Sequence, residues 1–237
     1  MSDLTRKAEE TWDTIAKSFD TTRRKPWKIC LDFINELSSN GIVADLGCGN
    51  GRHLLLCAER FKRVVGVDIS RNLLKIVQGK IEDKSFENVL LLQSNLVELP
   101  LKDNSFDRVL FIASLHNIKK RDSRIRSLKE LHRILKKNGV AMISVWSRWQ
   151  DGFAERFLVD LFLFPIRYIK ALGGYEFGDI EIFWRQHNLN VKRFYHLYSK
   201  REFIKDVKKA GLKIIEVKDV RLKSKKRPDN FFVVVRK

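Results

Sequence analysis

Continuous apolar segments alternate with helical patterns along the middle of the chain, and this alternation constrains the fold more than any other feature. Segments such as IVADLG, RVVGVD and FDRVLFIAS are apolar throughout, and stretches with helical spacing separate them. Strands of this kind are buried on both sides, which is typical of parallel sheets covered by helices. The sequence therefore predicts an α/β fold with a mostly parallel sheet and helices on both faces.

A Gly-rich stretch, ADLGCGNG, follows the first apolar strand. Glycines 47, 49 and 51 let the backbone turn sharply and approach a ligand where a side chain would clash. Their spacing differs from the dinucleotide fingerprint, and the preceding acid, Asp45, would repel a pyrophosphate but pair with an amino group. The motif predicts a ligand with an amino-acid moiety and no phosphates, held by Asp45, Gly47, Gly49 and Gly51.

Polar residues also follow the next two strands. Asp68 ends the second strand, where a carboxylate accepts both ribose hydroxyls of an adenosine. Asn95 follows the third strand and is expected to bond the adenine edge, with Leu96 supplying a backbone amide and an apolar wall. Chance is a poor explanation, because all of these residues fall at successive carboxyl ends of one sheet.

This set of residues, from roughly Ile42 to Trp146, resembles the class I S-adenosylmethionine-dependent methyltransferases. The resemblance implies an enzyme with S-adenosyl-L-methionine as cofactor. It also implies a Rossmann-like, seven-stranded, mostly parallel sheet, with N-terminal helices before it and an insertion after strand five.

The chain is expected to form a single domain, residues 1–237, because no linker or internal repeat divides it. An aromatic, Gly-containing segment from Ser147 interrupts the strand and helix rhythm, and insertions at the carboxyl ends of strands usually shape a ligand site. The chain ends in a pattern typical of an antiparallel hairpin at the sheet edge. The expected parts are N-terminal helices (1–40), a cofactor-binding core (41–146), an insertion (147–190) and a basic C-terminal part of the sheet (191–237).

The net charge is strongly positive, because 47 Lys and Arg residues stand against 29 Asp and Glu residues, which leaves +18. The last 48 residues hold 16 basic and 5 acidic side chains, so most of the excess lies there. A polyanionic partner such as a nucleic acid is the first explanation. The run KSKKR, residues 223–227, is expected to contact phosphates, although such a run is ordinarily a solvated loop.

Other features limit the setting. Three cysteines, an odd number without metal-ligand spacing, favour neither a disulfide framework nor a metal site, and a reducing, cytoplasmic setting is expected. The N-terminus lacks the apolar core of a signal peptide. The most apolar run, Phe157 to Ile169, is too short and too interrupted to span a membrane, so no membrane partner is expected; a membrane-surface role is the lesser alternative.

Motifs spread over almost the whole chain resemble a narrower family, the tRNA wobble-uridine carboxyl methyltransferases. They are SFDTTRRKPW, DLGCGNGRHL, ASLH, VWSRWQ, RFYHLYSKREF and DNFFVVVRK. Members of that family methylate 5-carboxymethyluridine at the first anticodon position of tRNA, and they work with a small zinc-ribbon activator protein. The resemblance implies tRNA as substrate and a heterodimer with such an activator.

Individual residues follow the family patterns closely. The T-R-x-K-P-W pattern is matched by Arg23, Lys25, Pro26 and Trp27, and the R-Y-Y-H-L-Y pattern by Arg193, Tyr195, His196, Leu197 and Tyr198. Two departures weaken the transfer: Asn117 follows His116 where a second histidine is common, and Asn95 stands where an aspartate is usual.

A carboxylate nucleophile is already ionised at neutral pH and needs no general base. The site needs a cation that orients the carboxylate, and Arg23 and Arg193 are the candidates because a guanidinium binds both oxygens. Arg23 also has a plainer interpretation, a surface cation near a helix start.

Aromatic and histidine residues are expected to hold the base. His116, at the end of the fourth strand, is the candidate for the uracil ring, while Tyr195, His196 and Trp184 are expected to stack on or hydrogen-bond a flipped-out base. His116 as an ordinary pocket histidine and Trp184 as a core residue are the alternatives.

Three functions compete at this point. The first is a methyltransferase acting on the carboxylate of 5-carboxymethyluridine in tRNA; the second is a class I methyltransferase acting on another RNA site or a small molecule; the third is a non-catalytic RNA-binding scaffold. The basic charge disfavours a small molecule, and the intact glycines and Asp68 disfavour a scaffold. An activator is expected on the apolar strand from Asn88 to Gln93, because such a strand at a sheet edge invites pairing.

Overall fold

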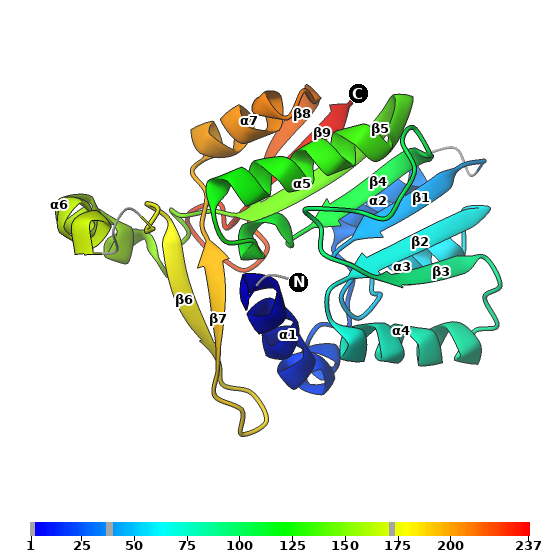
Figure 1. Cartoon of the computed structure of the whole chain (residues 1–237), viewed down its shortest axis with the longest axis horizontal. Coiled ribbons are helices and arrows are strands. Elements are labelled where there is room, and N and C mark those ends of the chain that lie inside the picture. Colours follow the sequence, from blue (N-terminus) through cyan, green and yellow to red (C-terminus); the bar gives the residue numbers. More distant parts are fainter. Residues whose placement is uncertain (1–2, 37–39, 171–173) are drawn as a thin grey trace.

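A seven-stranded sheet forms the centre of the molecule in the computed structural model, which describes residues 3–36, 40–170 and 174–237 (Figure 1). The strand order is β3-β2-β1-β4-β5-β9-β8. Neighbouring strands from β3 to β5 pair in parallel, and β9 lies antiparallel between β5 and β8. The strands are β1 Ile42–Leu46, β2 Arg63–Asp68, β3 Val89–Gln93, β4 Phe106–Ile112, β5 Leu135–Trp146, β8 Lys213–Val220 and β9 Asn230–Arg236. The sheet confirms the expected fold class and the antiparallel hairpin at its edge.

Helices cover both faces of this sheet. Leu128 of α5 and Phe203 of α7 pack in the apolar cluster on one face, while Phe33 of α2, Leu54 of α3 and Val77 of α4 pack in the cluster on the other. The helices are α1 Asp3–Thr22, α2 Lys28–Asn35, α3 Leu54–Ala58, α4 Arg71–Asp83, α5 Arg121–Ile134, α6 Ala154–Lys170 and α7 Lys200–Lys209, with a short 3-10 helix η1 Leu115–Asn117. Because both faces are covered, the ends of the strands are the natural place for a ligand.

The segment between β5 and α7 forms a separate small layer at one side of the sheet (Figure 1). It contains α6 and a hairpin of β6 Asp179–Trp184 and β7 Val191–His196, two strands that, within the described ranges, pair with each other and with no other strand. Ile180 of β6 lies opposite Tyr195 of β7, and both belong to an apolar cluster of the segment's own. The expectation that the sheet-forming C-terminal part begins at residue 191 is therefore wrong by one strand, because β7 finds its hydrogen-bond partner in β6.

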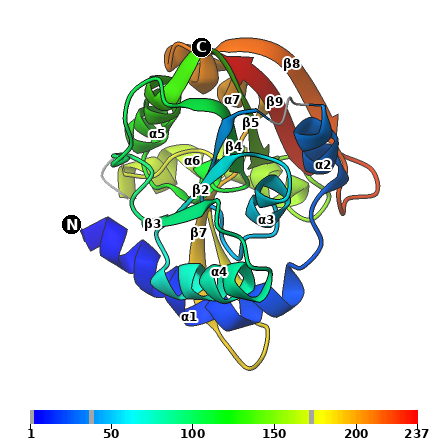
Figure 2. The same cartoon turned by 90° about the vertical axis from the view of Figure 1, so that its right-hand side faces the viewer.

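Helix α1 lies between the hairpin and α4, below the strand ends (Figures 1 and 2). Its Asp13 carboxylate accepts hydrogen bonds from the Ser70 hydroxyl at 2.5 Å and the Asn72 backbone N–H at 2.9 Å. These donors lie at the N-terminus of α4, where an acidic side chain is favourable. This contact holds α1 in place beside the carboxyl ends of the parallel strands.

Candidate active site

A cavity of about 1230 Å³ opens at the carboxyl ends of the parallel strands, and α1, β7 and the loop between β8 and β9 complete its walls. Most of the residues that the sequence predicts for the site line it. They are Arg23, Asp45, Gly47, Gly49, Asp68, Asn95, Leu96, His116, Arg193 and Tyr195. The folding of the sheet therefore gathers residues from six separate segments around one space.

The loop after β1 follows a path that requires glycine. Gly47 has a φ of +72°, and a Cβ built there would lie 2.3 Å from the Ser114 hydroxyl oxygen. Gly49 also has a positive φ, +56°, and its N–H donates to the Asp68 carboxylate at 2.8 Å. A side chain at Gly47 would displace Ser114, so this loop brings its bare backbone to the cavity.

Asp45 is a buried carboxylate at the end of β1. Burial and, to a smaller extent, the charge of the neighbouring Asp68 raise its pKa to about 7, although the charge of Arg52 opposes the shift. Within the described part of the chain, its Oδ2 atom has no hydrogen-bond partner. A buried, unpartnered acidic oxygen beside a cavity fits a cationic amino group, which would supply both charge and donor.

The next two strand ends present polar groups to the same cavity. Asp68 is buried, which raises its pKa, and the backbone N–H groups of Ser70 and Gly49 counter this effect. The Asn95 amide donates to the Thr5 hydroxyl of α1 at 2.9 Å and accepts from the Val97 N–H at 3.1 Å. Asn95 thus joins the cavity wall to α1, and an adenine bonded to its amide would compete with Thr5.

Three aromatic rings stack at the other side of the cavity. Tyr195 lies 4.9 Å from Trp146 and 5.4 Å from His116 between ring centroids, with interplanar angles of 16° and 23°. The His116 Nδ1 atom accepts the Trp146 backbone N–H at 3.2 Å, so the neutral ring carries its proton on Nε2. Burial lowers the pKa of His116 to about 3, helped by His196 and Arg193, and the ring is a neutral hydrogen-bond donor at physiological pH.

Two arginines reach the same region. Arg193 is only 7% exposed and lies against the rings of Trp12, Trp184 and Tyr195, whose hydroxyl it contacts. The guanidinium of Arg23 lies 5.3 Å from the Trp184 ring, and its charge lowers the pKa of Arg193 in addition to the larger effect of burial.

No carboxylate of the described residues lies within 4.0 Å of the Arg23 or Arg193 guanidinium, and the Nε atom of Arg193 has no partner among them. A buried cation without a counter-ion is costly unless it meets an anion in function. The two arginines therefore mark a place for an anionic group.

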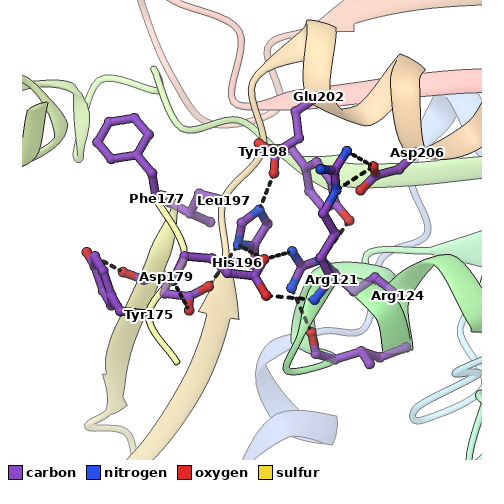
Figure 3. Close-up of polar contacts among 12 residues, drawn as sticks. Arg121, Arg124, Tyr175, Phe177, Asp179, His196, Leu197, Tyr198, Glu202 and Asp206 are labelled. Atoms are coloured by element: carbon purple, nitrogen blue, oxygen red, sulfur yellow. Dashed lines mark hydrogen bonds and ion pairs between the residues drawn. The ribbon is translucent and has the colours of Figure 1, made fainter. Parts of the chain in front are cut away.

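Three predicted site residues, Gly51, Trp184 and His196, lie outside the cavity wall. Trp184 is buried, and its Nε1–H donates to the Ser18 hydroxyl at 2.7 Å, which agrees with the alternative of a core residue. Gly51 has a φ of +80°, and a Cβ there would lie 3.1 Å from Val77, so it serves the packing of the loop against α4. His196 is fully buried and faces Asp179 and Glu202, each at 2.8 Å (Figure 3). The expectation that His196 meets the base is wrong, because its ring is enclosed by these carboxylates.

The sequence analysis missed Asn50, the next-to-last residue of the Gly-rich stretch. Its buried amide donates to the Asp20 carboxylate at 2.9 Å and to the Arg23 carbonyl oxygen at 3.1 Å. Lys80 contacts the same Asp20 oxygen at 2.5 Å. These bonds fix the segment that carries Arg23 to the loop after β1, and no short motif signals a contact of this kind.

The basic loop between β8 and β9 forms part of the cavity wall through Lys223 and Lys225. The Asp229 carboxylate accepts the backbone N–H groups of residues 222–224, and the Asp151 carboxylate accepts those of residues 225–227. Both acids thus bind the backbone of the loop. The run KSKKR identified this loop in the sequence, but no sequence motif predicts that Asp151 and Asp229 bind its backbone.

Comparison with known proteins identifies the class. Residues 44–143 match the family model described as Methyltransferase domain. A protein of Encephalitozoon cuniculi (strain GB-M1) named Putative methyltransferase ECU09_1500 is 30% identical over 206 residues, which are 86% of this chain and 86% of the relative. The solved structure of a SAM-dependent methyltransferase from Methanosarcina mazei superposes with a TM-score of 0.72 at 20% identity, covering 90% of this chain and 98% of that one. The chain belongs to the class I S-adenosylmethionine-dependent methyltransferases, and S-adenosyl-L-methionine is its cofactor.

More specific names occur among the relatives. The tRNA (carboxymethyluridine(34)-5-O)-methyltransferase of Schizosaccharomyces pombe is 27% identical over 220 residues, 87% of this chain and 89% of the relative. Proteins with that activity in their names from Mus musculus and Arabidopsis thaliana match 60% and 59% of this chain, and the chain spans only 20% and 32% of their length. A putative methyltransferase solved in complex with the Trm112 methyltransferase activator of Haloferax volcanii has a TM-score of 0.67 at 15% identity, with coverages of 97% and 96%.

No helix among the described residues is long and apolar enough to cross a membrane.

Proposed function

We propose that this enzyme transfers a methyl group to the carboxylate of 5-carboxymethyluridine at the wobble position of tRNA, giving the methyl ester. The observation that carries the proposal is the Arg193 guanidinium, buried beside the cavity without a carboxylate partner among the described residues. A carboxylate substrate would supply the missing anion. The name of the Schizosaccharomyces pombe relative supports the same substrate.

The cofactor is assigned to the strand ends. Asp45 would pair with its amino group, Asp68 would accept from its ribose hydroxyls, and Asn95 and Leu96 would hold its adenine. When bound, S-adenosylmethionine supplies a methyl group on a sulfonium. The unpartnered Asp45 oxygen and the bare backbone at Gly47 and Gly49 support this placement.

The reaction demands alignment more than activation. The substrate carboxylate is ionised at neutral pH, so the chain needs no general base for it. Arg23 and Arg193 would orient the two oxygens, and the neutral His116 would donate its Nε2 proton to the base. Holding the reactants in line supplies up to ~7 to 11 kcal/mol of the barrier reduction. Methylation removes the negative charge, so the ester loses its attraction to the arginines and dissociates more readily.

A zinc-ribbon activator and a cytoplasmic location belong to the same proposal. The strand β3 is an edge of the sheet, and the side chain of its Leu90 is 56% exposed. An edge strand offers unpaired backbone groups to a partner. The neighbour that was solved in complex with the Trm112 methyltransferase activator supports an activator as partner.

The test uses methyl-labelled S-adenosylmethionine and two matched tRNAs, one bearing 5-carboxymethyluridine at the wobble position and one bearing the corresponding carboxamide. The protein is assayed alone and with a zinc-ribbon activator. We expect label only on the carboxymethyl tRNA, and we expect mild alkali to release it, because an ester hydrolyses whereas an N-methyl or ring C-methyl group does not. Label that survives alkali, or equal labelling of the carboxamide tRNA, would contradict the proposal and favour another RNA methylation site.

A further inference from the structure

We propose that His196 is a positioning residue: by bridging Asp179 and Glu202 it fixes the β6–β7 hairpin, so that Arg193 and Tyr195 face the cavity. The kinetic test of this proposal rests on the proposed function, whereas the structural test does not. The sequence pattern places His196 next to Tyr195, but the two side chains act on different sides of the strand.

The ring of His196 is held at both nitrogens. Its Nδ1 atom lies 2.8 Å from Asp179 on β6, and its Nε2 atom lies 2.8 Å from Glu202 on α7. Burial raises the pKa of Glu202, but the hydrogen bond from His196 and the charges of His196, Arg148 and Arg124 outweigh it and lower that pKa. Each ring nitrogen faces a carboxylate oxygen of a different element, so the ring ties β6 and β7 to α7.

Further ion pairs extend this bridge into the body of the protein (Figure 3). Arg148, just after β5, donates to the second Glu202 oxygen at 2.7 Å. The fully buried Arg124 of α5 contacts Glu176, which precedes β6, and donates to the Tyr198 hydroxyl at 2.9 Å. The hairpin is therefore fastened through charged groups to both α5 and α7.

Such a network is poorly explained by stability alone. Buried ion pairs cost desolvation, and apolar residues of similar volume often give equal or greater stability. Charged groups do fix geometry, because removing one partner leaves another buried and unpaired. The network thus selects one placement of the hairpin among several that apolar packing would allow.

That placement matters because of strand alternation. Successive side chains of β7 point to opposite sides, so Arg193 and Tyr195 share one side and His196 lies on the other. Tyr195 stacks on His116 and Trp146 in the cavity wall, while His196 faces α7. If the contacts of His196 were lost and β7 moved, Arg193 and Tyr195 on the other side of the strand would move with it.

A metal ion is the competing interpretation, because ligand atoms of Glu176, Asp179 and His196 lie within 4.8 Å of one another. Arg124 already binds Glu176, and both nitrogens of His196 face carboxylates. Arg148, which pairs with Glu202, is also close enough to Asp179 for their charges to interact, so it would repel a divalent cation there. The group is an ion-pair cluster.

The experiment compares His196→Gln with His132→Gln, a matched change on α5 outside both the cavity and the cluster. Protein labelled with ¹⁵N-tryptophan reports each indole N–H, and single Trp→Phe variants assign the signals. In the His196 variant we expect shifts at Trp146, which stacks on Tyr195, and at Trp184, whose Nε1 donates to Ser18 at 2.7 Å. Trp27, which packs on Phe232 in the core, should stay in place, and His132→Gln should move none of them.

Kinetics with carboxymethyl tRNA provide the second readout. We expect kcat/KM to fall at least about tenfold, because small misplacements of positioning groups have effects of this size. The Kd for S-adenosylmethionine should stay within about twofold of the original value, since Asp45 and Asp68 lie at the strand ends and not on the hairpin. If His196→Gln does not fold, Asp179→Asn, which weakens the same bridge from β6, must give the same pattern.

The outcomes are distinct. Unchanged Trp146 and Trp184 signals would overturn the inference, as would a shift of Trp27 together with lost cofactor binding, which indicates a general structural role. Absence of turnover in the unchanged protein would instead overturn the proposed function, and the indole signals would still test the bridge.

Discussion

Asp45 shows how one buried side chain links the fold to cofactor binding. Its carboxylate lies at the end of β1, and burial raises its pKa to about 7. An ammonium group placed at its unpartnered oxygen would favour the ionised form and lower that pKa again. Binding of the cofactor and loss of a proton from Asp45 are therefore coupled.

This coupling predicts a pH dependence. Below pH 7 the carboxyl group is protonated and cannot pair with the ammonium, so affinity for S-adenosylmethionine should fall as pH falls through 7. The fraction of ionised Asp45 changes about tenfold between pH 8 and pH 6, and we expect Kd to rise by about that factor. Calorimetry in buffers of different ionisation enthalpy measures both Kd and proton release. Asp45→Asn should bind weakly at both pH values; a similar pH response in that variant would assign the proton to another group.

Arg193 is expected to act on the substrate and not on the cofactor. Replacing it by glutamine removes a charge-assisted contact of ~1.5 to 3 kcal/mol, so kcat/KM for carboxymethyl tRNA should fall about 10- to 100-fold. The Kd for S-adenosylmethionine should not change. Arg201→Gln, an exposed change on α7, is the control. Retained turnover in Arg193→Gln would return that arginine to a purely structural role.

The predictions for the site fail mainly where a residue's role depends on the direction of its side chain. Asp45 and Asp68 were predictable because the carboxyl end of a parallel strand faces one edge of the sheet. His196 was not, because a motif gives neighbours along the chain and the face of β7 that meets the cavity depends on tertiary packing. Asn50 was not, because its partners Asp20 and Arg23 approach only when α1 folds over the sheet.

At the scale of elements, the two edges of the sheet form a natural comparison. The outer strands β3 and β8 each carry one strongly exposed aliphatic residue, Leu90 at 56% and Ile215 at 55%. Only β3 lies next to the β2 end of the sheet, where Asp68 faces the cofactor cavity. A partner on β3 would thus be close to the cofactor site.

We therefore expect Leu90→Lys to weaken the complex with a zinc-ribbon activator at least about tenfold, which is about 1.4 kcal/mol, because the lysine charge would be buried in the interface without a partner. Ile215→Lys adds the same charge at the opposite edge and should leave the complex intact. Co-purification and titration of the activator measure both. Equal effects of the two changes would place the activator elsewhere.

Element types were largely predictable, and their ends and pairings were not. The apolar runs predicted β1, β2 and β4 correctly, because a strand that is buried on both faces must consist almost entirely of apolar residues. Residues 191–196 are expected in the C-terminal part of the sheet, but in the structure they form β7, which pairs with β6. Its pairing with β6 depends on the cluster around Ile180 and Phe157, which the sequence order does not reveal.

For the whole molecule, charge is the dominant property. The net charge of +18 is concentrated towards the C-terminus, and the folded chain brings part of it to the cavity through Lys223 and Lys225. The charge of Arg23 lowers the pKa of Lys223, so these cations lie close enough to repel each other. A polyanion at this face would relieve that repulsion, which ties the surface charge to the same substrate as the site.

Salt dependence provides the test at this scale. The affinity for tRNA falls as salt rises, so the slope of log K against log salt is negative. If Lys225, Lys226 and Arg227 contact tRNA phosphates, changing all three to alanine should make this slope shallower by about 2 to 3. Changing Lys208, Lys209 and Lys213 to alanine removes the same charge from α7 and β8, and it should alter the slope by less than about 1. Anisotropy of a labelled tRNA between about 50 and 200 mM salt measures both. Equal slopes for the two triple variants would mean that the charge acts only through the long-range electrostatic field. If the affinity of the unchanged protein does not depend on salt, the protein makes no phosphate contacts that contribute to binding.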